Sequence, residues 1–144
     1  ADAMVRILAS TTTQQSTPTG DVLTRDQMRD LQSLVREVLC GTHLLRFVAE
    51  LVLATHPDRA RTADRTSRFV RYGASARAGQ AIVLGAKARA LLAGRPAVVR
   101  EDIDACLLPA LGHRVQLRFE AEAERITPAD LLVDWTNEAE RRSR

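Results

Sequence analysis

The sequence has few aromatic residues and few of the residues that interrupt helices. Its 144 residues include one tryptophan, one tyrosine, three phenylalanines, five prolines and seven glycines. The core of a single domain of this length must therefore be built from leucine, valine, isoleucine and alanine. Because strand-like runs are short, the sequence predicts an all-α fold, a small bundle of about five helices with short irregular or extended connections.

Cysteine is scarce, and no long apolar segment is present. Cys40 and Cys106 lie far apart in the chain and in apolar surroundings, which favours buried thiols in a reducing compartment over a disulfide framework. No run approaches the roughly 18 apolar residues of a membrane-spanning helix. The first residues also lack the pattern of a secretory signal. We therefore expect a cytoplasmic protein without a membrane segment.

Lysine is almost absent. Of 21 basic residues only Lys87 is a lysine, and the formal net charge is +3. Arginine is the better bidentate partner for phosphate and carboxylate, so the composition permits anion binding without requiring it. The positive charge also allows nucleic acid as a partner, although the aromatic residues that stack on bases are scarce.

Motifs for an independent catalytic site are missing. The sequence has no Gly-rich loop followed by Lys-Ser or Lys-Thr and no GxGxxG, so this chain is not expected to hydrolyse a nucleotide unaided. A Gly-x-Ser-x-Gly elbow is also absent. Cys40 and His43 come nearest to a metal-ligand spacing, and a buried thiol beside an exposed imidazole explains them better than zinc. We predict no self-contained catalytic residues and no metal site.

The N-terminal segment predicts a domain boundary. Residues 4–9 form a short apolar run that looks like the end of a helix, and residues 10–20 are polar, uncharged and without periodicity, which is linker composition. We therefore divide the chain into a helix end at 1–9, a linker at 10–22 and a helical domain at 23–144.

Apolar periodicity and cap signals predict five helices in the helical domain. The first begins after a capping box of Thr24 and Gln27, and the last after the start signal of Thr127 to Asp130. The predicted helices cover residues 25–39, 44–56, 76–93 and 101–111, and a segment from 128 onward. The first two are expected to form an antiparallel pair. The third, rich in alanine and glycine and ending at Gly94, is expected to be central.

Residues 58–72 lack apolar periodicity. They contain five arginines, and Asp58 and Asp64 are the acidic residues among them. A charge run of this kind is usually a solvated surface. We therefore expect an exposed basic loop that leads into the third predicted helix.

The start of the third predicted helix has a cation in an unusual position. Ser75 is a good N-cap residue, and Gly73 lets the backbone turn sharply before it. Arg77 would lie in the first turn, where acidic residues are preferred by up to about 1 kcal/mol. A helix N-terminus with an added guanidinium is suited to phosphate. The alternative is that Arg77 extends into solvent or pairs with a nearby carboxylate.

These residues resemble the MoxR family of AAA+ ATPases. Residues 73–78, Gly-Ala-Ser-Ala-Arg-Ala, are similar to the GASPRA signature of that family's C-terminal lid domain. The similarity extends in the family's order over about residues 22–135, through segments at 47–55, 87–103, 111–115 and 120–124. Two positions depart from the family: Ala76 replaces its proline, and Val99 replaces a threonine cap worth about 1 kcal/mol.

The resemblance implies a role for Arg77. It would be the sensor-2 arginine, which reaches from the lid to the β- and γ-phosphates of ATP, with Gly73 and Ser75 supporting it at the helix N-terminus. ATP and Mg²⁺ would be bound mainly by a preceding ATPase core domain, of which residues 5–8 would be the tail. The resemblance also implies a chaperone or assembly factor that forms a homo-oligomeric ring and works with von Willebrand A-domain partners.

Two other functions are consistent with the residues. A basic helical module would bind nucleic acid through the arginines between Arg59 and Arg77, with strong salt dependence. A structural interaction domain would instead pair Arg77 with a carboxylate such as Asp64. The resemblance favours the lid over both and disfavours nucleic acid as a partner.

Overall fold

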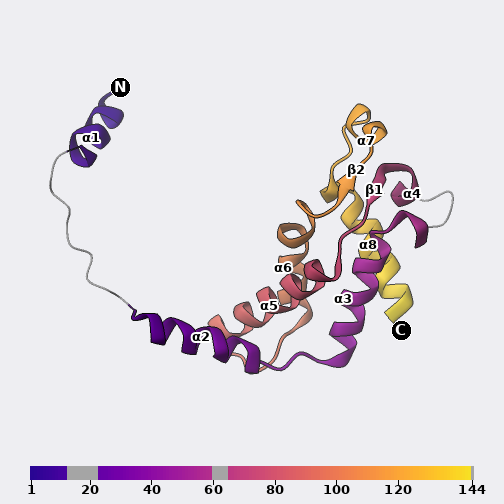
Figure 1. Cartoon of the computed structure of the whole chain (residues 1–144), viewed down its shortest axis with the longest axis horizontal. Coiled ribbons are helices and arrows are strands. Elements are labelled where there is room, and N and C mark those ends of the chain that lie inside the picture. The colour runs from indigo at the N-terminus through magenta and orange to yellow at the C-terminus, as the bar shows by residue number, and fades with distance from the viewer. Residues whose placement is uncertain (13–22, 60–64, 144) are drawn as a thin grey trace. The chain divides into compact units, whose positions relative to one another are not determined.

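The computed structural model describes residues 1–12, 23–59 and 65–143 (Figure 1). The chain divides into two compact units, residues 1–31 and 32–144, each of which is described by itself. Most of the predicted linker, at 13–22, and part of the predicted basic loop, at 60–64, lie outside the described residues. Within the described ranges, no helix is long and apolar enough to cross a membrane.

The first unit is helical where the sequence predicts helix. α1 spans Asp2–Thr11, and α2, which continues into the second unit, spans Arg25–Glu37. α2 begins with the predicted capping box: the Thr24 N–H donates to Oε1 of Gln27 at 2.8 Å, and the Gln27 N–H donates to Oγ1 of Thr24 at 3.2 Å. The box fixes the start of α2 by contacts within one turn, which is why sequence reasoning finds it.

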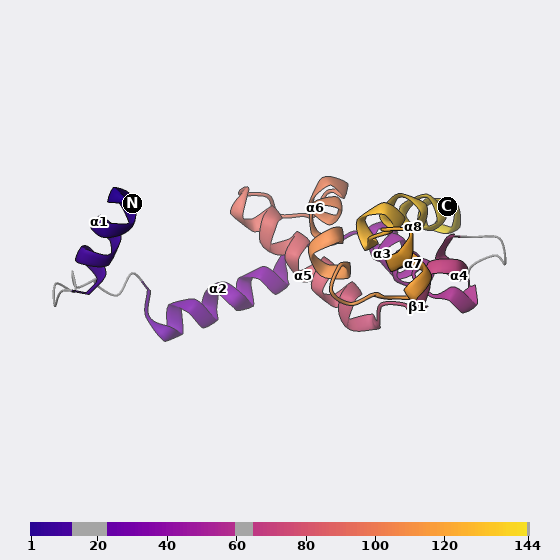
Figure 2. The ribbon, with the colours of Figure 1, turned by 90° about the horizontal axis from the view of Figure 1, so that it is seen from above.

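Four long helices form the second unit. They are α3 (Thr42–Ala54), α5 (Ala76–Leu92), α6 (Arg100–Leu111) and α8 (Pro128–Ser143). α3 packs along α8, α5 packs along α6, and α3 also contacts α5, as Figures 1 and 2 show. The predicted antiparallel pairing of α2 with α3 is wrong: the main partner of α3 is α8, and α2 buries none of its side chains.

Short elements lie between α3 and α5, where the sequence predicts an exposed loop. They are the 3-10 turn η1 (Pro57–Arg59), α4 (Arg65–Phe69) and β1 (Val70–Tyr72). β1 pairs antiparallel with β2 (Gln116–Leu117), and α7 (Phe119–Ala123) follows β2 and contacts α4. The loop prediction is wrong for residues 65–72, because Thr66, Phe69 and Val70 are buried.

α5 has a row of fully buried side chains, three of which are alanines. Ala78, Ile82, Ala86 and Ala90 follow one another at four-residue spacing, and each has 0% of its surface exposed. Short side chains let a neighbouring helix approach closely. A Cβ added at Gly85 would lie only 2.9 Å from Sγ of Cys106 on α6. This packing agrees with the prediction that α5 is the central helix.

α5 ends at the predicted glycine. Gly94 has φ +69°. Its N–H donates to the Leu91 carbonyl at 2.9 Å, and the N–H of Arg95 donates to the Ala90 carbonyl at 2.8 Å. These two bonds are the Schellman motif, which satisfies the last carbonyls of the helix and requires a left-handed residue that glycine adopts without strain.

An extended segment after α5 pairs with the residues that follow α2. Leu39 and Ala97 form an isolated parallel bridge. The Leu39 N–H donates to the Pro96 carbonyl, and the Val98 N–H donates to the Leu39 carbonyl, both at 2.9 Å. On α5, Nζ of Lys87 donates to the Arg36 carbonyl at 2.8 Å. A cation at the C-terminus of α2 is favourable because the helix dipole is negative there.

Asp102 joins the turn after α5 to the start of α6. Its buried carboxylate accepts hydrogen bonds from Nη1 and Nη2 of Arg95 at 2.6 and 2.7 Å. Oδ2 also accepts the N–H of Val99 at 3.1 Å, which keeps one half of a capping box although valine has no hydroxyl. The hydrogen bonds from Arg95 lower the pKa of Asp102 and outweigh the opposing effect of burial.

The lowered pKa of Asp102 predicts loss of stability in acid. Its folded pKa lies below the unfolded value of about 4, so the stabilisation is fully present above that value and is lost as the pH falls through the folded pKa. We expect the urea concentration at the midpoint of unfolding to decrease as the pH is lowered below about 4. At neutral pH, Asp102→Asn should lower the free energy of unfolding by about 2 kcal/mol and should flatten the acid branch. Parallel pH profiles for wild type and variant would contradict this.

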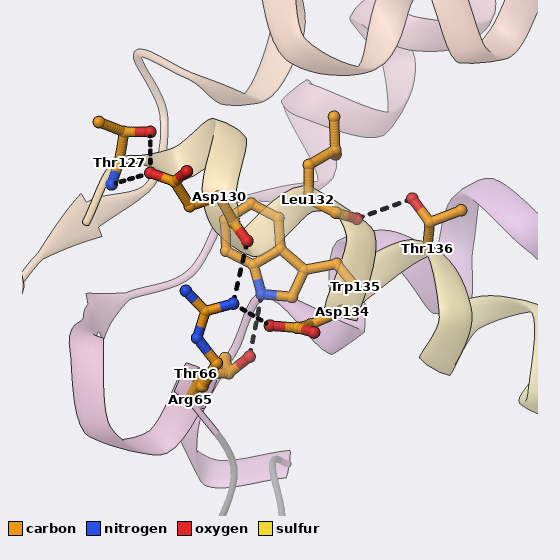
Figure 3. A network of polar contacts seen from close by, with 8 residues as sticks. All are labelled: Arg65, Thr66, Thr127, Asp130, Leu132, Asp134, Trp135 and Thr136. Atoms are coloured by element: carbon orange, nitrogen blue, oxygen red, sulfur yellow. Dashed lines mark hydrogen bonds and ion pairs between the residues drawn. The ribbon is translucent and has the colours of Figure 1, made fainter.

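α8 is attached to α4 by the polar network in Figure 3. Trp135 is buried, and its Nε1–H donates to Oγ1 of Thr66 at 3.0 Å. On the exposed side of the network, Nη1 of Arg65 donates to Oδ2 of Asp134 at 3.0 Å. A buried indole needs a partner for its N–H, so Thr66 specifies where α4 lies against α8.

The start of α8 is the predicted cap. Oδ2 of Asp130 accepts the N–H of Thr127 at 2.8 Å and its hydroxyl at 2.6 Å. Pro128 occupies the first helical position, where its missing N–H costs nothing. The helix continues to Ser143 and so includes the charged residues that follow Trp135.

We predict that the buried contact in Figure 3 is worth more than the exposed one. Thr66→Val leaves the Trp135 N–H without this acceptor and should lower the free energy of unfolding by about 1–2 kcal/mol. Arg65→Ala should cost less than about 1 kcal/mol, because the pair is solvated. Unfolding in urea, followed by the fluorescence of Trp135, measures both. An Arg65→Ala variant that loses as much free energy of unfolding as Thr66→Val would contradict this ranking.

Candidate functional site

The N-terminus of α5 lies beside an apolar groove. The groove has a volume of about 950 Å³ and is lined chiefly by α3 and α5. Val48 and Val52 line it from α3, and Gly79 and Val83 from α5. Ser75 and Ala76, at the start of α5, also belong to its wall. The predicted site residues therefore lie where α3 ends and α5 begins.

Arg77 lies in the first turn of α5, as the sequence predicts, and its side chain is exposed. No hydrogen bond or ion pair joins its guanidinium to another residue in the described part of the chain. Its neighbour Ala78 is fully buried, so the core fixes the first turn of the helix while Arg77 remains accessible. Asp64, the carboxylate of the structural alternative, lies outside the described residues.

Ser75 occupies the N-cap position of α5, with φ −79° and ψ 170°. The predicted N-cap position is confirmed, but the hydroxyl does not accept a hydrogen bond from a first-turn N–H, as an N-cap serine commonly does. Its carbonyl accepts the N–H of Ala78 at 2.8 Å. The first N–H groups of α5 are therefore not occupied by the serine hydroxyl and point out of the helix end, as helix N-termini do at anion sites.

The turn before α5 is held against the end of α3. The N–H of Ala74 donates to Oγ1 of Thr55 at 2.9 Å, and Nε2 of His56 lies 2.9 Å from the Ala74 carbonyl, which requires the proton on Nε2. A Cβ added at Gly73 would lie 2.7 Å from Cγ of His56 and 2.8 Å from the Thr55 carbonyl. Gly73 is thus needed for close approach, and its φ is not in the left-handed region.

Sequence reasoning missed Thr55 and His56 as residues of this site. Thr55 is the last residue of the segment at 47–55 that resembles the MoxR family. This resemblance is the one feature of the sequence that could have identified it. Its contact with Ala74 joins residues 19 apart in the sequence, so no pattern within one helix predicts it. The sequence predicts His56 only as the last residue of the helix at 44–56, with no contact to the turn at Ala74.

Two arginines of the predicted basic loop have acidic partners. Arg65 pairs with Asp134, and Arg68 pairs with Glu124. The guanidinium of Arg71 lies 5.3 Å from the centre of the Tyr72 ring. The predicted basic surface is therefore partly neutralised by acids from α8 and the end of α7, far along the chain.

The cysteines are less buried than the sequence predicts. Cys40 and Cys106 are free thiols and are partly buried. Burial raises the pKa of both, which favours the unreactive thiol form. In the described part of the chain, no cluster of histidine, cysteine, aspartate and glutamate could hold a metal ion.

The fold and the site together define a small helical domain in which an accessible arginine begins a central buried helix. The model of the AAA lid domain family matches residues 62–135. The chain belongs to this family, and the predicted helical fold is confirmed.

Known proteins similar to the chain are larger. Chaperone MoxR1 of Mycobacterium tuberculosis is 30% identical over 115 residues, which are 80% of this chain and 29% of that protein. Protein MoxR of Paracoccus denitrificans is 37% identical over 116 residues, which are 74% of this chain and 34% of that protein. The chain therefore spans about a third of the length of these relatives.

The fold also matches a solved structure. The crystal structure of a protein from Cytophaga hutchinsonii that is assigned as an ATPase has a TM-score of 0.80 and 23% sequence identity. The match covers 95% of this chain and 42% of that one. At this identity the match supports the fold alone.

The close approach at Gly73 predicts a steric effect. Gly73→Ala would place a Cβ against His56 and the Thr55 carbonyl and should lower the free energy of unfolding by about 1–3 kcal/mol. Gly79→Ala is the matched control, since its Cβ would lie an ordinary 3.5 Å from Cγ2 of Val52. It should be neutral or stabilising by up to about 1 kcal/mol. Urea unfolding compares the two, and a harmless Gly73→Ala would refute the close approach.

Proposed function

We propose that this chain is the lid of a MoxR-like AAA+ ATPase, in which Arg77 acts as the sensor-2 arginine. Membership of the AAA lid domain family and similarity to two MoxR proteins support the ATPase context. One observation supports the role of Arg77 above all: its side chain is exposed at the start of α5, and its guanidinium has no partner among the described residues.

The chemistry of this position suits a terminal phosphate. The guanidinium of Arg77 donates charge-assisted hydrogen bonds, which are about twice as strong as neutral ones and can be bidentate. The first N–H groups of α5 and its dipole add positive potential at the same end, and Ser75 does not cap them. Gly73 supports the site because it lets the preceding turn lie directly against α3.

The contact would couple hydrolysis to movement. Arg77 binds a terminal phosphate oxygen of ATP, and the contact is lost after that phosphate leaves. The lid then moves as a body relative to the domain that binds the nucleotide, a hinge motion biased by one contact. In a homo-oligomeric ring, this motion would drive a chaperone or assembly activity on partners such as von Willebrand A-domain proteins.

Most of the nucleotide site would lie beyond this chain. The core domain would hold ATP and Mg²⁺, and the metal would neutralise charge that develops on the phosphates. The chain spans about a third of its relatives, so there is room in them for such a domain. The free thiols of Cys40 and Cys106 support a cytoplasmic location.

The test compares arginines in the full-length protein. Arg77→Ala should lower the ATPase kcat by about tenfold or more, the scale of one lost contact to the transition state. Arg77→Lys should recover part of the loss, because it keeps the charge without the bidentate geometry. Arg46→Ala, at an exposed position on α3, is the matched control and should leave turnover unchanged.

Steady-state turnover and the affinities for ATP and ADP are measured on all four proteins. Loss of turnover with an unchanged melting temperature assigns Arg77 to the nucleotide site. Unchanged turnover in Arg77→Ala rejects the sensor role and leaves its exposed position to be explained by another partner.

A further inference from the structure

Both polar groups of Ala74 are bound by the end of α3. Its N–H donates to Oγ1 of Thr55, and its carbonyl accepts from Nε2 of His56, each at 2.9 Å. Its methyl group is fully buried in the core. Ala74 lies three residues before Arg77, and no residue of the turn between them makes a capping bond with its side chain. The position of the helix start is therefore set largely by the end of α3.

We propose that Thr55 and His56 are positioning residues for Arg77. This inference rests on the proposed function, since it concerns how the arginine is held where it can meet a phosphate. The two side chains do not reach the phosphate in this proposal. They fix the backbone from which Arg77 extends.

The hydroxyl of Thr55 makes one hydrogen bond within α3 and one to the turn before α5. Thr55 is the C-cap residue of α3 and has 0% of its surface exposed. Its hydroxyl donates to the Val52 carbonyl, in the last turn of α3, at 2.6 Å. The same oxygen accepts the Ala74 N–H. One oxygen therefore links the last turn of α3 to the residue before the N-cap of α5, without a flexible side chain between them.

His56 closes the other side of the same turn. Its ring packs against Gly73 so tightly that a Cβ added there would lie 2.7 Å from Cγ. The ring cannot move toward the turn, and its Nε2 reaches the Ala74 carbonyl. Thr55 and His56 thus hold Ala74 from two directions, and a displacement of the turn along either direction breaks a hydrogen bond.

The geometry of α5 makes this restraint matter for Arg77. Ala78 is buried and the adjacent Arg77 is exposed, so the arginine is the immediate neighbour of a core residue. Each residue turns the helix by about 100°. A small rotation or shift of the first turn therefore redirects the guanidinium. Misplacement of a functional group by about 1 Å can lower the rate by about 100-fold. A restraint on the backbone that prevents such a shift would therefore preserve the rate.

The test is a double-mutant cycle in the full-length protein. Thr55→Val keeps the shape of the side chain and removes both hydrogen bonds, and Thr55→Ser keeps the hydroxyl. His56→Phe keeps a ring and removes the donor. Thr66→Val is the control, because it removes a buried hydroxyl of the same domain at the contact with Trp135. Each variant is assayed for kcat, for the affinities of ATP and ADP, and for melting temperature, and Thr55→Val is also combined with Arg77→Ala.

We expect Thr55→Val to lower kcat by about tenfold and to reduce the preference for ATP over ADP. Thr55→Ser should restore both, and His56→Phe should show a smaller loss in the same direction. Thr66→Val should lower the melting temperature and leave kcat within about twofold. If Thr55 acts through Arg77, the double variant should be no slower than Arg77→Ala alone.

Three results would overturn the proposal. In the first, Arg77→Ala lowers turnover and neither Thr55→Val nor His56→Phe does; the sensor role then stands and the positioning role falls. In the second, the losses of Thr55→Val and Arg77→Ala multiply in the double variant, so Thr55 acts elsewhere. In the third, Arg77→Ala has no effect, which rejects the proposed function and the positioning role with it. A Thr55→Val that does not fold leaves the decision to His56→Phe.

Discussion

The small buried face of α5 is the constraint on which the second unit depends. Ala78, Ile82, Ala86 and Ala90 are fully buried, and short side chains at three of these positions let α3 and α6 approach the helix closely. With few aromatic residues available, the core gains its density from this close approach of backbones. A larger residue at these positions would have to displace a neighbouring helix, because closely packed interiors have little room for added atoms.

Short side chains also determine the geometry of the candidate site. Gly73 and Ala74 have almost no side chain, so the turn before α5 can lie against Thr55 and His56 and be held through its backbone. The restraint then comes from α3, which packs along α8. Arg77 therefore extends from a helix whose start is held against the body of the domain, as the proposed contact with a phosphate would require.

The polar contacts of the second unit differ in what they do. Three buried polar side chains, the hydroxyls of Thr55 and Thr66 and the carboxylate of Asp102, connect different elements of the fold. Each makes hydrogen bonds to neighbouring residues. Such groups specify one arrangement of the helices, because any other arrangement leaves a buried polar atom without a partner. The exposed pairs of Arg65 and Arg68 add little energy and keep the basic segment against acidic partners.

The sequence by itself determined the features that depend on neighbours within one turn. The capping box of Thr24 and Gln27, the Schellman glycine at Gly94 and the cap of Thr127 use contacts three to five residues apart, so local chemistry decides them. The position of Arg77 in a first turn follows in the same way, and the family resemblance predicted the class of domain.

Tertiary structure alone decided the features that depend on residues far apart in the sequence. These are the pairing of α3 with α8, the burial of residues in α4 and β1, and the contact of Thr55 with Ala74. Short segments such as α4 bury too few residues to show a period, and a hydrogen bond across 19 residues leaves no local pattern.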